Sequence, residues 1–552
     1  MVILSRRSLL AAPAAALAAP VAAQPGVSDI LDVSQPVLLD DRVARGYRRD
    51  VLLRWGDRVA FNAPPWNPNL PDAEAGATQF AWDARLAAIV APPPAADGVA
   101  RLVAVFSHAS VESRMAFPSL LPNPAIEIGM VGASVVNFEF LGGRWVVVDG
   151  GFQARRLTGS TFCRLAGPAA GDGRLRTTED PAGMTARGIL APEGGCATPW
   201  RTVLLAEGDP GPQLSSWREL APRFREGNEA NRFGWIVELD ALDPTAVPAK
   251  RTALGRFPKA DAAVALASDG RPVIYMTEAR RDGYLFRFVA ARGPEGDGLA
   301  ANGALLDDGA LFVARVEGAT IRWLRLPATP AALMEARATA ESLGATPFDA
   351  PSGLAVAPDG RLFLACRGAE RTPARLDSLN PRPINPWGHV VEILPENRDH
   401  ASPTAFGAVL ILGGDPAQPG ATARYRAGSR VWLAAPSVLE ADRRGRLFIG
   451  TAQGPLQRAT GIADGIFVCG TGPGAARGAI ALLYAAPRAA TIGGLRFSPD
   501  QATLFSVVRT PGAEQGADFT RPATRWPAFE PALPPRTTVI AIARDRGGAI
   551  GG

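Results

Sequence analysis

The sequence predicts an all-β protein, and a β-propeller is the architecture that fits it best. Beyond residue 30 the chain consists of short apolar runs rich in β-forming residues, separated by Gly, Pro and Asp. Long helical periodicities are scarce. The 552 residues include 59 Gly and 50 Pro, which supply the turns that many short strands need.

The strands can be assigned in chain order. They are expected at 100–107, 133–140, 144–149, 200–206, 234–239, 273–276, 284–289, 311–316, 361–366, 389–393, 446–450 and 504–508. Several follow the same polar turn, as in Asp359-Gly360 before 361–366 and Arg444-Gly445 before 446–450. Such turns provide the positive φ of a tight hairpin.

Recurrence of these hairpins over roughly 400 residues favours blades repeated around an axis, because blade-on-blade packing removes long exposed edges. Two stacked β-sandwiches would give a similar pattern and remain an alternative. The repeats are too irregular for the blades to be counted. Helical periodicity is concentrated at 329–343, which predicts a short amphipathic insertion helix.

Composition excludes several kinds of site. Of the 58 basic residues only Lys250 and Lys259 are lysines, which leaves 56 arginines, and there are only 3 histidines. Acidic and basic residues are interspersed and the net charge is +5, so no nucleic-acid partner is expected. The 4 cysteines show no zinc-binding spacing, although one disulfide is possible.

The N-terminus predicts export. Arg6-Arg7 precedes an alanine-rich apolar stretch that ends in a small-residue cleavage pattern before Gln24. We expect residues 1–23 to be a twin-arginine signal peptide, residues 24–95 an N-terminal segment, and residues 96–545 the propeller. The stretch is too short and too weakly apolar for a membrane anchor, and no later segment spans a membrane. The protein is expected in the periplasm or outside the cell.

A series of motifs resembles the PhoX-type alkaline phosphatases in content and order between about residues 100 and 512. The motifs are Ala-Thr-Pro-Trp at 197–200 followed by Glu207, Asn-Arg-Phe-Gly-Trp at 231–235, Gly-Arg-Phe at 255–257, Tyr-Leu-Phe-Arg-Phe at 284–288 and Asn-Pro-Trp-Gly-His at 385–389. The resemblance implies a six-bladed propeller that hydrolyses phosphomonoesters with iron and calcium ions in its central channel. Such ions polarise the phosphoryl group for in-line displacement.

The sequence departs from this family at the expected ligands. Glu193 stands where the family has a cysteine, and Cys196 lies nearer to the Thr-Pro-Trp motif. Glu207 and Glu278 are the two acids that remain at matching places. These four residues are therefore the candidate metal ligands. A reduced site would hold Ca²⁺, whereas the family's Fe³⁺ is not expected because most of its anionic ligands are replaced.

Five further residues are candidates through the resemblance. Lys259 stands where the family has a metal-proximal histidine, so its ammonium would substitute for metal charge, and Arg371 would grip a phosphate. Arg382, Asn385 and His389 are candidate substrate-binding residues. Each of these residues could instead have only a structural role. The arginines would then be surface residues, Lys259 a loop residue, and His389 a buried, hydrogen-bonded side chain.

Three functions follow from these observations. The first is an exported, monomeric phosphomonoester hydrolase whose catalysis is altered or impaired by the missing ligands. The second is a non-catalytic propeller that binds an anion or a partner in its channel, and the third is a calcium-dependent lactonase or esterase. A small phosphorylated or anionic ligand is expected in the first two.

Overall fold

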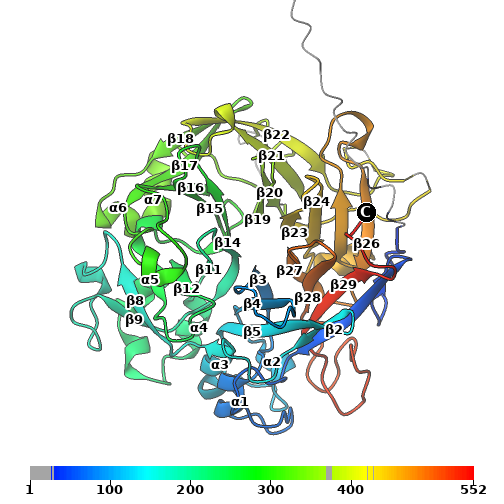
Figure 1. The fold of residues 1–552 in the computed structure, drawn as a ribbon, viewed down its shortest axis with the longest axis horizontal. Helices are drawn as coiled ribbons and strands as arrows, with labels where there is room; N and C mark the ends of the chain where they lie inside the picture. The colour runs from blue at the N-terminus through cyan, green and yellow to red at the C-terminus, as the bar shows by residue number, and fades with distance from the viewer. Residues whose placement is uncertain are drawn as a thin grey trace, which may run out of the picture.

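A computed structural model describes residues 27, 30, 32–368, 376–418, 420–426 and 428–551. Strands arranged around a central axis make up most of the structure, and short helices lie at the periphery (Figure 1). The all-β prediction is confirmed as a mostly β fold. Each of the twelve expected strands is present with its ends within two residues of the expected ones.

The strands form five sheets. The first contains β3 (Arg85–Val90), β4 (Arg101–His108), β5 (Gly132–Leu141), β6 (Arg144–Val147) and β7 (Arg155–Leu157). The second contains, in spatial order, β10 (Pro192–Ala197), β11 (Thr202–Glu207), β12 (Ile236–Asp240), β13 (Ala249–Arg251), β8 (Phe162–Ala166) and β9 (Thr185–Arg187).

The third sheet has nine strands in the order β14 (Lys259–Leu266), β15 (Pro272–Glu278), β16 (Leu285–Ala290), β17 (Gly309–Glu317), β18 (Thr320–Arg325), β22 (Thr404–Leu412), β21 (His389–Pro395), β20 (Leu362–Cys366) and β19 (Pro351–Val356). The fourth sheet contains, in spatial order, β1 (Arg42–Val43), β26 (Ile480–Ala485), β25 (Gly465–Cys469), β24 (Leu447–Thr451) and β23 (Pro436–Ala441). The fifth contains, in spatial order, β2 (Tyr47–Arg54), β29 (Thr538–Arg544), β28 (Thr503–Arg509) and β27 (Thr491–Phe497).

Six inner strands line the axis: β3, β10, β14, β19, β23 and β27. Each packs against the next, and β27 packs against β3, so the contacts close into a ring (Figure 1). Strands β14 and β19 are the two edges of the nine-stranded sheet and also contact each other, so this sheet is nearly closed on itself. A ring of inner strands is the arrangement expected of a propeller.

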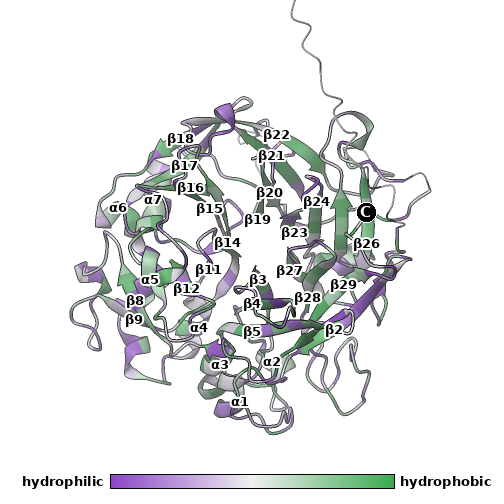
Figure 2. Cartoon of the chain, in the orientation of Figure 1, coloured by the Kyte–Doolittle hydropathy of each residue, from purple (hydrophilic) through white to green (hydrophobic). Residues whose placement is uncertain are grey.

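The two ends of the chain meet in the sheets. β2 pairs antiparallel with β29, from Tyr47 opposite Arg544 to Arg54 opposite Thr538, and β1 pairs with β26. Segment 24–95 therefore supplies outer strands to the last two sheets and also the inner strand β3. Strand β2 carries mostly polar residues, whereas most other strands are hydrophobic, which fits its place at the rim (Figure 2).

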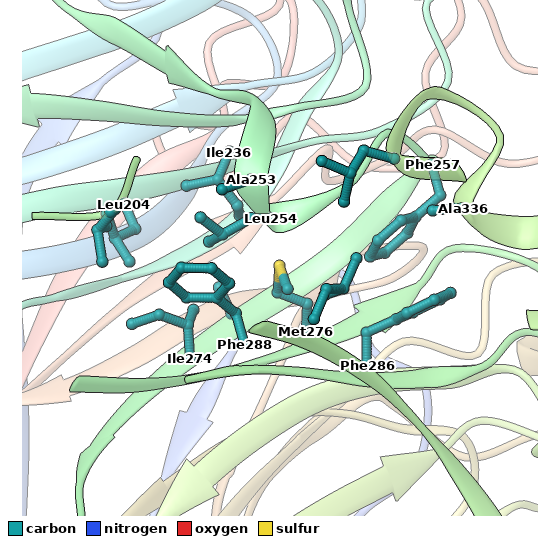
Figure 3. Packing of buried hydrophobic residues seen from close by; sticks show 14 of the residues in the cluster. Leu204, Ile236, Ala253, Leu254, Phe257, Ile274, Met276, Phe286, Phe288 and Ala336 are labelled. Carbon is teal, nitrogen blue, oxygen red and sulfur yellow. The ribbon is translucent and has the colours of Figure 1, made fainter. Parts of the chain in front are cut away.

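Hydrophobic side chains fill the spaces between sheets. The largest cluster joins β11 and β12 to β15 and β16, with Leu204, Met276 and Phe286 fully buried (Figure 3). The rings of Phe257 and Phe286 stack with centroids 4.1 Å apart. Burial of this many apolar side chains supplies most of the favourable free energy of folding.

The helices are short: α1 (Ala73–Thr78), α2 (Ser113–Ala116), α3 (Pro124–Met130), α4 (Gly211–Ser216), α5 (Gly298–Asn302), α6 (Pro330–Met334), α7 (Ala336–Ser342) and α8 (Leu456–Thr460). The expected helix at 329–343 is two helices, because Glu335 leaves the helical region with φ −112° and ψ 44°. Among the described residues, no helix is long and apolar enough to cross a membrane. The structure describes all four cysteines, and none of them forms the disulfide that the sequence left possible.

Two side chains connect the inner strands at the axis. The Asp261 carboxylate on β14 accepts hydrogen bonds from the amides of Gly195 on β10 and Leu354 on β19, both at 3.0 Å. Arg496 on β27 donates to the carbonyl oxygens of Ala87 on β3 and Gly195, and to Glu440 on β23 at 3.1 Å. Together these contacts reach all six inner strands.

Glu440 predicts a pH-dependent stability. Burial, only partly opposed by Arg496, raises the pKa of the Glu440 carboxyl from 4.5 to about 7. The folded protein therefore binds this proton more tightly than the unfolded chain does. The contribution to the free energy of unfolding is greatest below pH 4.5 and is lost as the pH rises to about 7.

Urea unfolding at pH 5 and pH 7 would measure this loss. In Glu440→Gln the fall in unfolding free energy between the two pH values should be smaller by about 1–3 kcal/mol than in the wild type. The exposed Glu530→Gln provides a control with the same chemical change. If the unfolding free energy falls equally between pH 5 and pH 7 in Glu440→Gln and the wild type, the raised pKa of Glu440 is contradicted.

Candidate functional site

A cavity of about 660 Å³ lies at the ends of the inner strands. Arg85 begins β3, Glu193 lies on β10, Ala260 on β14 and Ser352 on β19, and all four line the cavity. The ring of strands therefore brings residues that are far apart in the sequence to one place.

A second cavity, of about 540 Å³, adjoins the first. Both are lined by Arg85, Arg367 and Ala452, so these residues form the junction between them. Trp82 and Met115 supply apolar surface to the second cavity. The two cavities together offer room for a ligand considerably larger than a single phosphate ion.

Positive charge dominates the first cavity. Its lining includes the four arginines Arg85, Arg280, Arg281 and Arg367 but only one acid, Glu193. Glu193 is already engaged, because its Oε2 lies 2.5 Å from Arg85 Nη2. The Nε of Arg85 is buried and donates to no described atom. Burial and the nearby positive charge of Arg509 lower the pKa of Arg85.

Arg509 adds a further guanidinium beside the junction, in the second cavity. It forms a two-pronged ion pair with the buried Asp83, and one of its bonds measures 2.8 Å. Burial alone would raise the pKa of Asp83, but the adjacent Arg509 outweighs it and holds the pKa below the usual value. Asp83 therefore neutralises Arg509 and leaves little negative charge for any other group.

Arg367, at the junction of the two cavities, has no acidic partner among the described residues. It follows β20, and its Nη2 donates to the carbonyl oxygen of Ala452 at 3.1 Å. No carboxylate of the described part of the chain forms an ion pair with it. Burial and the charge of Arg509 lower its pKa, and Glu193 only partly opposes them. The junction thus holds Arg85, Arg367 and Arg509 against Glu193 and Asp83, which leaves an excess of positive charge.

Glu207, a candidate metal ligand, is fully buried at the end of β11. Its Oε1 accepts from Lys250 Nζ at 2.8 Å, and its two oxygens also accept from the amides of Leu190 and Trp235, each at 3.2 Å. The lysine and two amides therefore occupy the positions around the carboxylate that a cation would need.

The other candidate metal ligands are likewise not part of any group of three or more possible ligands among the described residues. Glu278, at the end of β15, accepts from Arg337 Nη1 at 2.7 Å, and burial raises its pKa although Arg337 opposes the shift. Burial raises the pKa of the Cys196 thiol to about 12, so this thiol is protonated at neutral pH. Of the four candidates only Glu193 lines the central cavity.

Lys259 is fully buried on β14, opposite Glu278 in the strand register. Its Nζ donates to the carbonyl oxygens of Gly234 and Gly255, both at 2.8 Å, and lies 3.7 Å from the centre of the Phe257 ring. Burial lowers the pKa of this amine well below its usual value. Its hydrogen bonds are with backbone carbonyl oxygens, and it does not line the cavity.

The remaining candidates form a separate hydrogen-bonded group. Arg382 donates to Asn385 Oδ1 at 3.3 Å, and Asn385 Nδ2 lies 2.8 Å from His389 Nδ1. His389 Nε2 in turn contacts the carbonyl oxygen of Leu379 at 2.8 Å. None of these three side chains lines the central cavity. Arg371 lies outside the described residues.

The donor set does not fit the metal cluster that the sequence resemblance implies. Within the described residues no three His, Cys, Asp or Glu side chains are grouped so that they could hold a metal ion. Between two of the inner strands, the Ser352 hydroxyl donates to the Ser437 carbonyl oxygen at 2.9 Å. A neutral hydrogen bond thus joins β19 to β23 there.

The comparisons with known proteins identify the family. The family model described as alkaline phosphatase PhoX matches residues 35–512. The chain belongs to the alkaline phosphatase PhoX family. Pseudomonas fluorescens PhoX in complex with vanadate, a transition-state analogue, superposes on this PhoX-family chain with a TM-score of 0.85. The two are 27% identical, and the match covers 96% of this chain and 99% of that one.

Another solved structure, a gluconolactonase from Xanthomonas campestris, is 11% identical, with a TM-score of 0.29, and the match covers 84% of this chain and 98% of that one. No curated protein matches the sequence. The PhoX relationship supports a phosphomonoesterase-like function, whereas the likeness to the lactonase carries no such weight.

Sequence reasoning missed the cavity arginines Arg85, Arg280, Arg281 and Arg367. With 56 arginines in the chain, residue type alone could not select them. Arg85 begins the inner strand β3, and Arg280 and Arg281 lie in the tight turn after β15. Recognition of the inner strands would have pointed to Arg85, because their ends surround the axis.

The Lys250–Glu207 pair gives a test of whether this acid is structural. Both side chains are fully buried, so Lys250→Met should leave an uncompensated carboxylate and lower the free energy of unfolding by about 3–5 kcal/mol. Lys250→Met combined with Glu207→Gln should recover a large part of this loss. Chemical denaturation measures both effects. If the single variant is as stable as the wild type, Glu207 has some other source of positive charge.

Proposed function

We propose that this protein is an exported PhoX-family propeller that binds phosphomonoesters through channel arginines and hydrolyses them slowly or not at all. The observation that carries the proposal is the cavity lined by four arginines and a single, already paired acid. The planar fork of a guanidinium matches two oxygens of a phosphate and keeps its charge at any physiological pH.

Arg367 is the natural anchor for the phosphate. It has no acidic partner in the described structure and lies at the junction beside Arg85, which lines both cavities. An anion placed between them would neutralise the excess positive charge. The vanadate complex of the Pseudomonas relative supports this class of ligand, because vanadate is a tetrahedral oxyanion like phosphate.

The second cavity gives the ligand's organic part a place to bind. It adjoins the junction, and its lining combines Trp82 and Met115 with charged residues such as Glu112 and Glu514. A phosphomonoester held by Arg85 and Arg367 could place its phosphate in one cavity and its alcohol portion in the other. This arrangement favours an ester over inorganic phosphate, since apolar contact adds binding free energy.

We expect slow hydrolysis because arginine side chains do not activate a water molecule for attack. Guanidinium groups stabilise negative charge on a phosphoryl group, but they do not generate a nucleophile from water as a metal ion does. Each acid that sequence reasoning assigned to a metal is instead bonded to a lysine or arginine. We derive no catalytic step through a metal ion for this chain.

The six inner strands support a count of six blades. Each would begin one blade, and the nine-stranded sheet would then be two blades joined at their outer strands, β18 and β22. This count agrees with the family resemblance, and the proposed phosphate-binding arginines would then lie at the ends of the inner strands.

Binding without metal is the central test. In buffer containing EDTA, isothermal titration calorimetry should detect vanadate binding to the purified protein, and Arg367→Ala should weaken it at least about 10-fold because a charge-assisted hydrogen bond is lost. Arg325→Ala, which removes an exposed arginine on β18, should leave the affinity unchanged. Loss of binding on chelation, or equal affinity of Arg367→Ala and wild type, would refute the proposal.

Hydrolysis can be measured on the same preparations. Turnover of an aryl phosphate should be at least about 100-fold slower than that of the Pseudomonas relative, with or without added Ca²⁺ and Fe³⁺. If either added metal raised the turnover to that of the Pseudomonas relative, a catalytic metal site would have assembled, and the proposal of slow hydrolysis would be wrong.

Export is tested through the paired arginines at the start of the chain. Replacement of Arg6 and Arg7 by lysine keeps the positive charge but removes the pair that the twin-arginine pathway recognises. The variant should accumulate inside the cell, whereas the wild type should be processed at about residue 23. Immunoblots of cell fractions measure both, and normal processing of the variant would exclude this route.

A further inference from the structure

We propose that the channel selects ligands with two phosphate groups over ligands with one, an inference that rests on the proposed phosphomonoester binding. One phosphate would bind at Arg85 and Arg367, and the second at Arg280 and Arg281. All four side chains line the same cavity of about 660 Å³. That volume is large enough for a sugar-sized scaffold between the two groups.

The second pair of arginines lies on a fixed turn. Arg280 and Arg281 follow β15, and the turn is tied to its surroundings by backbone hydrogen bonds from Ala279 N to Pro258 O at 2.9 Å and from Ala350 N to Arg281 O at 2.8 Å. Gly283 approaches the Glu278 carbonyl oxygen so closely that a Cβ would lie 2.3 Å from it. These contacts fix the backbone of the turn, so that only the arginine side chains have to be ordered by a bound anion.

Positive charge on this turn is incompletely neutralised. Arg280 Nε lies 3.8 Å from Asp282 Oδ1, a weak contact, and the other oxygen of Asp282 is bonded to Arg337 at 3.0 Å. Arg281 makes no ion pair with any carboxylate that the structure describes. The turn therefore offers an anion a guanidinium with no competing acid.

The two groups of arginines in this cavity have the same electrostatic character. Arg367 at the junction and Arg281 on the turn each lack an acidic partner among the described residues, while Glu193 is engaged with Arg85. Binding of one phosphate would neutralise one of these two centres and leave the other. A ligand with two phosphates satisfies both, and the second binding event is intramolecular, which raises the overall affinity.

A matched pair of ligands isolates the second phosphate. Fructose 1,6-bisphosphate and fructose 6-phosphate share a scaffold and differ in one phosphate group. In EDTA at constant ionic strength, calorimetry should show the bisphosphate binding at least about 10-fold more tightly. Arg281→Ala should reduce this ratio to about one and leave the affinity for fructose 6-phosphate unchanged, whereas Arg367→Ala should weaken both ligands.

Arg325→Ala is the control for the loss of one positive charge, and it should preserve the wild-type ratio at 0.1 M salt, where distant charges are screened. Equal affinities of the wild type for the two sugars would overturn this inference but leave phosphomonoester binding standing. An unchanged ratio in Arg281→Ala would also overturn it. Failure of both sugar phosphates to bind would instead refute the proposed function.

Discussion

The close approach of six strands around one axis is the constraint on which the rest of the structure depends. Asp261 and Arg496 satisfy polar backbone groups there, and both contact Gly195: its amide donates to Asp261 and its carbonyl oxygen accepts from Arg496. Two side chains thus connect strands from every part of the ring. Both charged side chains line a small cavity at the axis together with Arg85, Ala260 and Ser352. These last three residues also line the arginine-rich cavity of about 660 Å³.

The same crowding determines which residues the inner strands can carry. A Cβ on Gly195 would lie 2.2 Å from the carbonyl oxygen of Leu204, and one on Gly353 would lie 2.5 Å from that of Ser437. A Cβ on Gly494 would meet the Leu86 carbonyl oxygen at 2.3 Å. Glycine is required at such places because neighbouring backbones leave no space for a side chain.

This crowding explains how much of the fold could be predicted. Outer strands such as Leu285–Ala290 are continuous runs of bulky residues, and the sequence predicted them well. The inner strands read instead as Pro-Glu-Gly-Gly-Cys-Ala in β10 or Pro-Ser-Gly-Leu-Ala-Val in β19, which resemble loops by composition, and none was predicted. The cavity arginines were missed with them, and an ion pair such as Arg85–Glu193 joins residues that only the closed ring brings together.

Several acids in and around the channel are paired with basic side chains. A cluster of metal ions needs several uncompensated carboxylates, and here Glu207, Glu278 and Asp83 each face a lysine or arginine. A single acid introduced at Ser352 would add a negative charge to the cavity that Arg85 and Arg367 line, where these arginines could pair with it before any cation did. A metal site would require several added acids and, at the same time, the removal of the lysines and arginines that would pair with them. Under the proposed function, arginines supply the positive charge that metal ions supply in a metal-dependent phosphatase, and they stabilise a bound oxyanion without activating water.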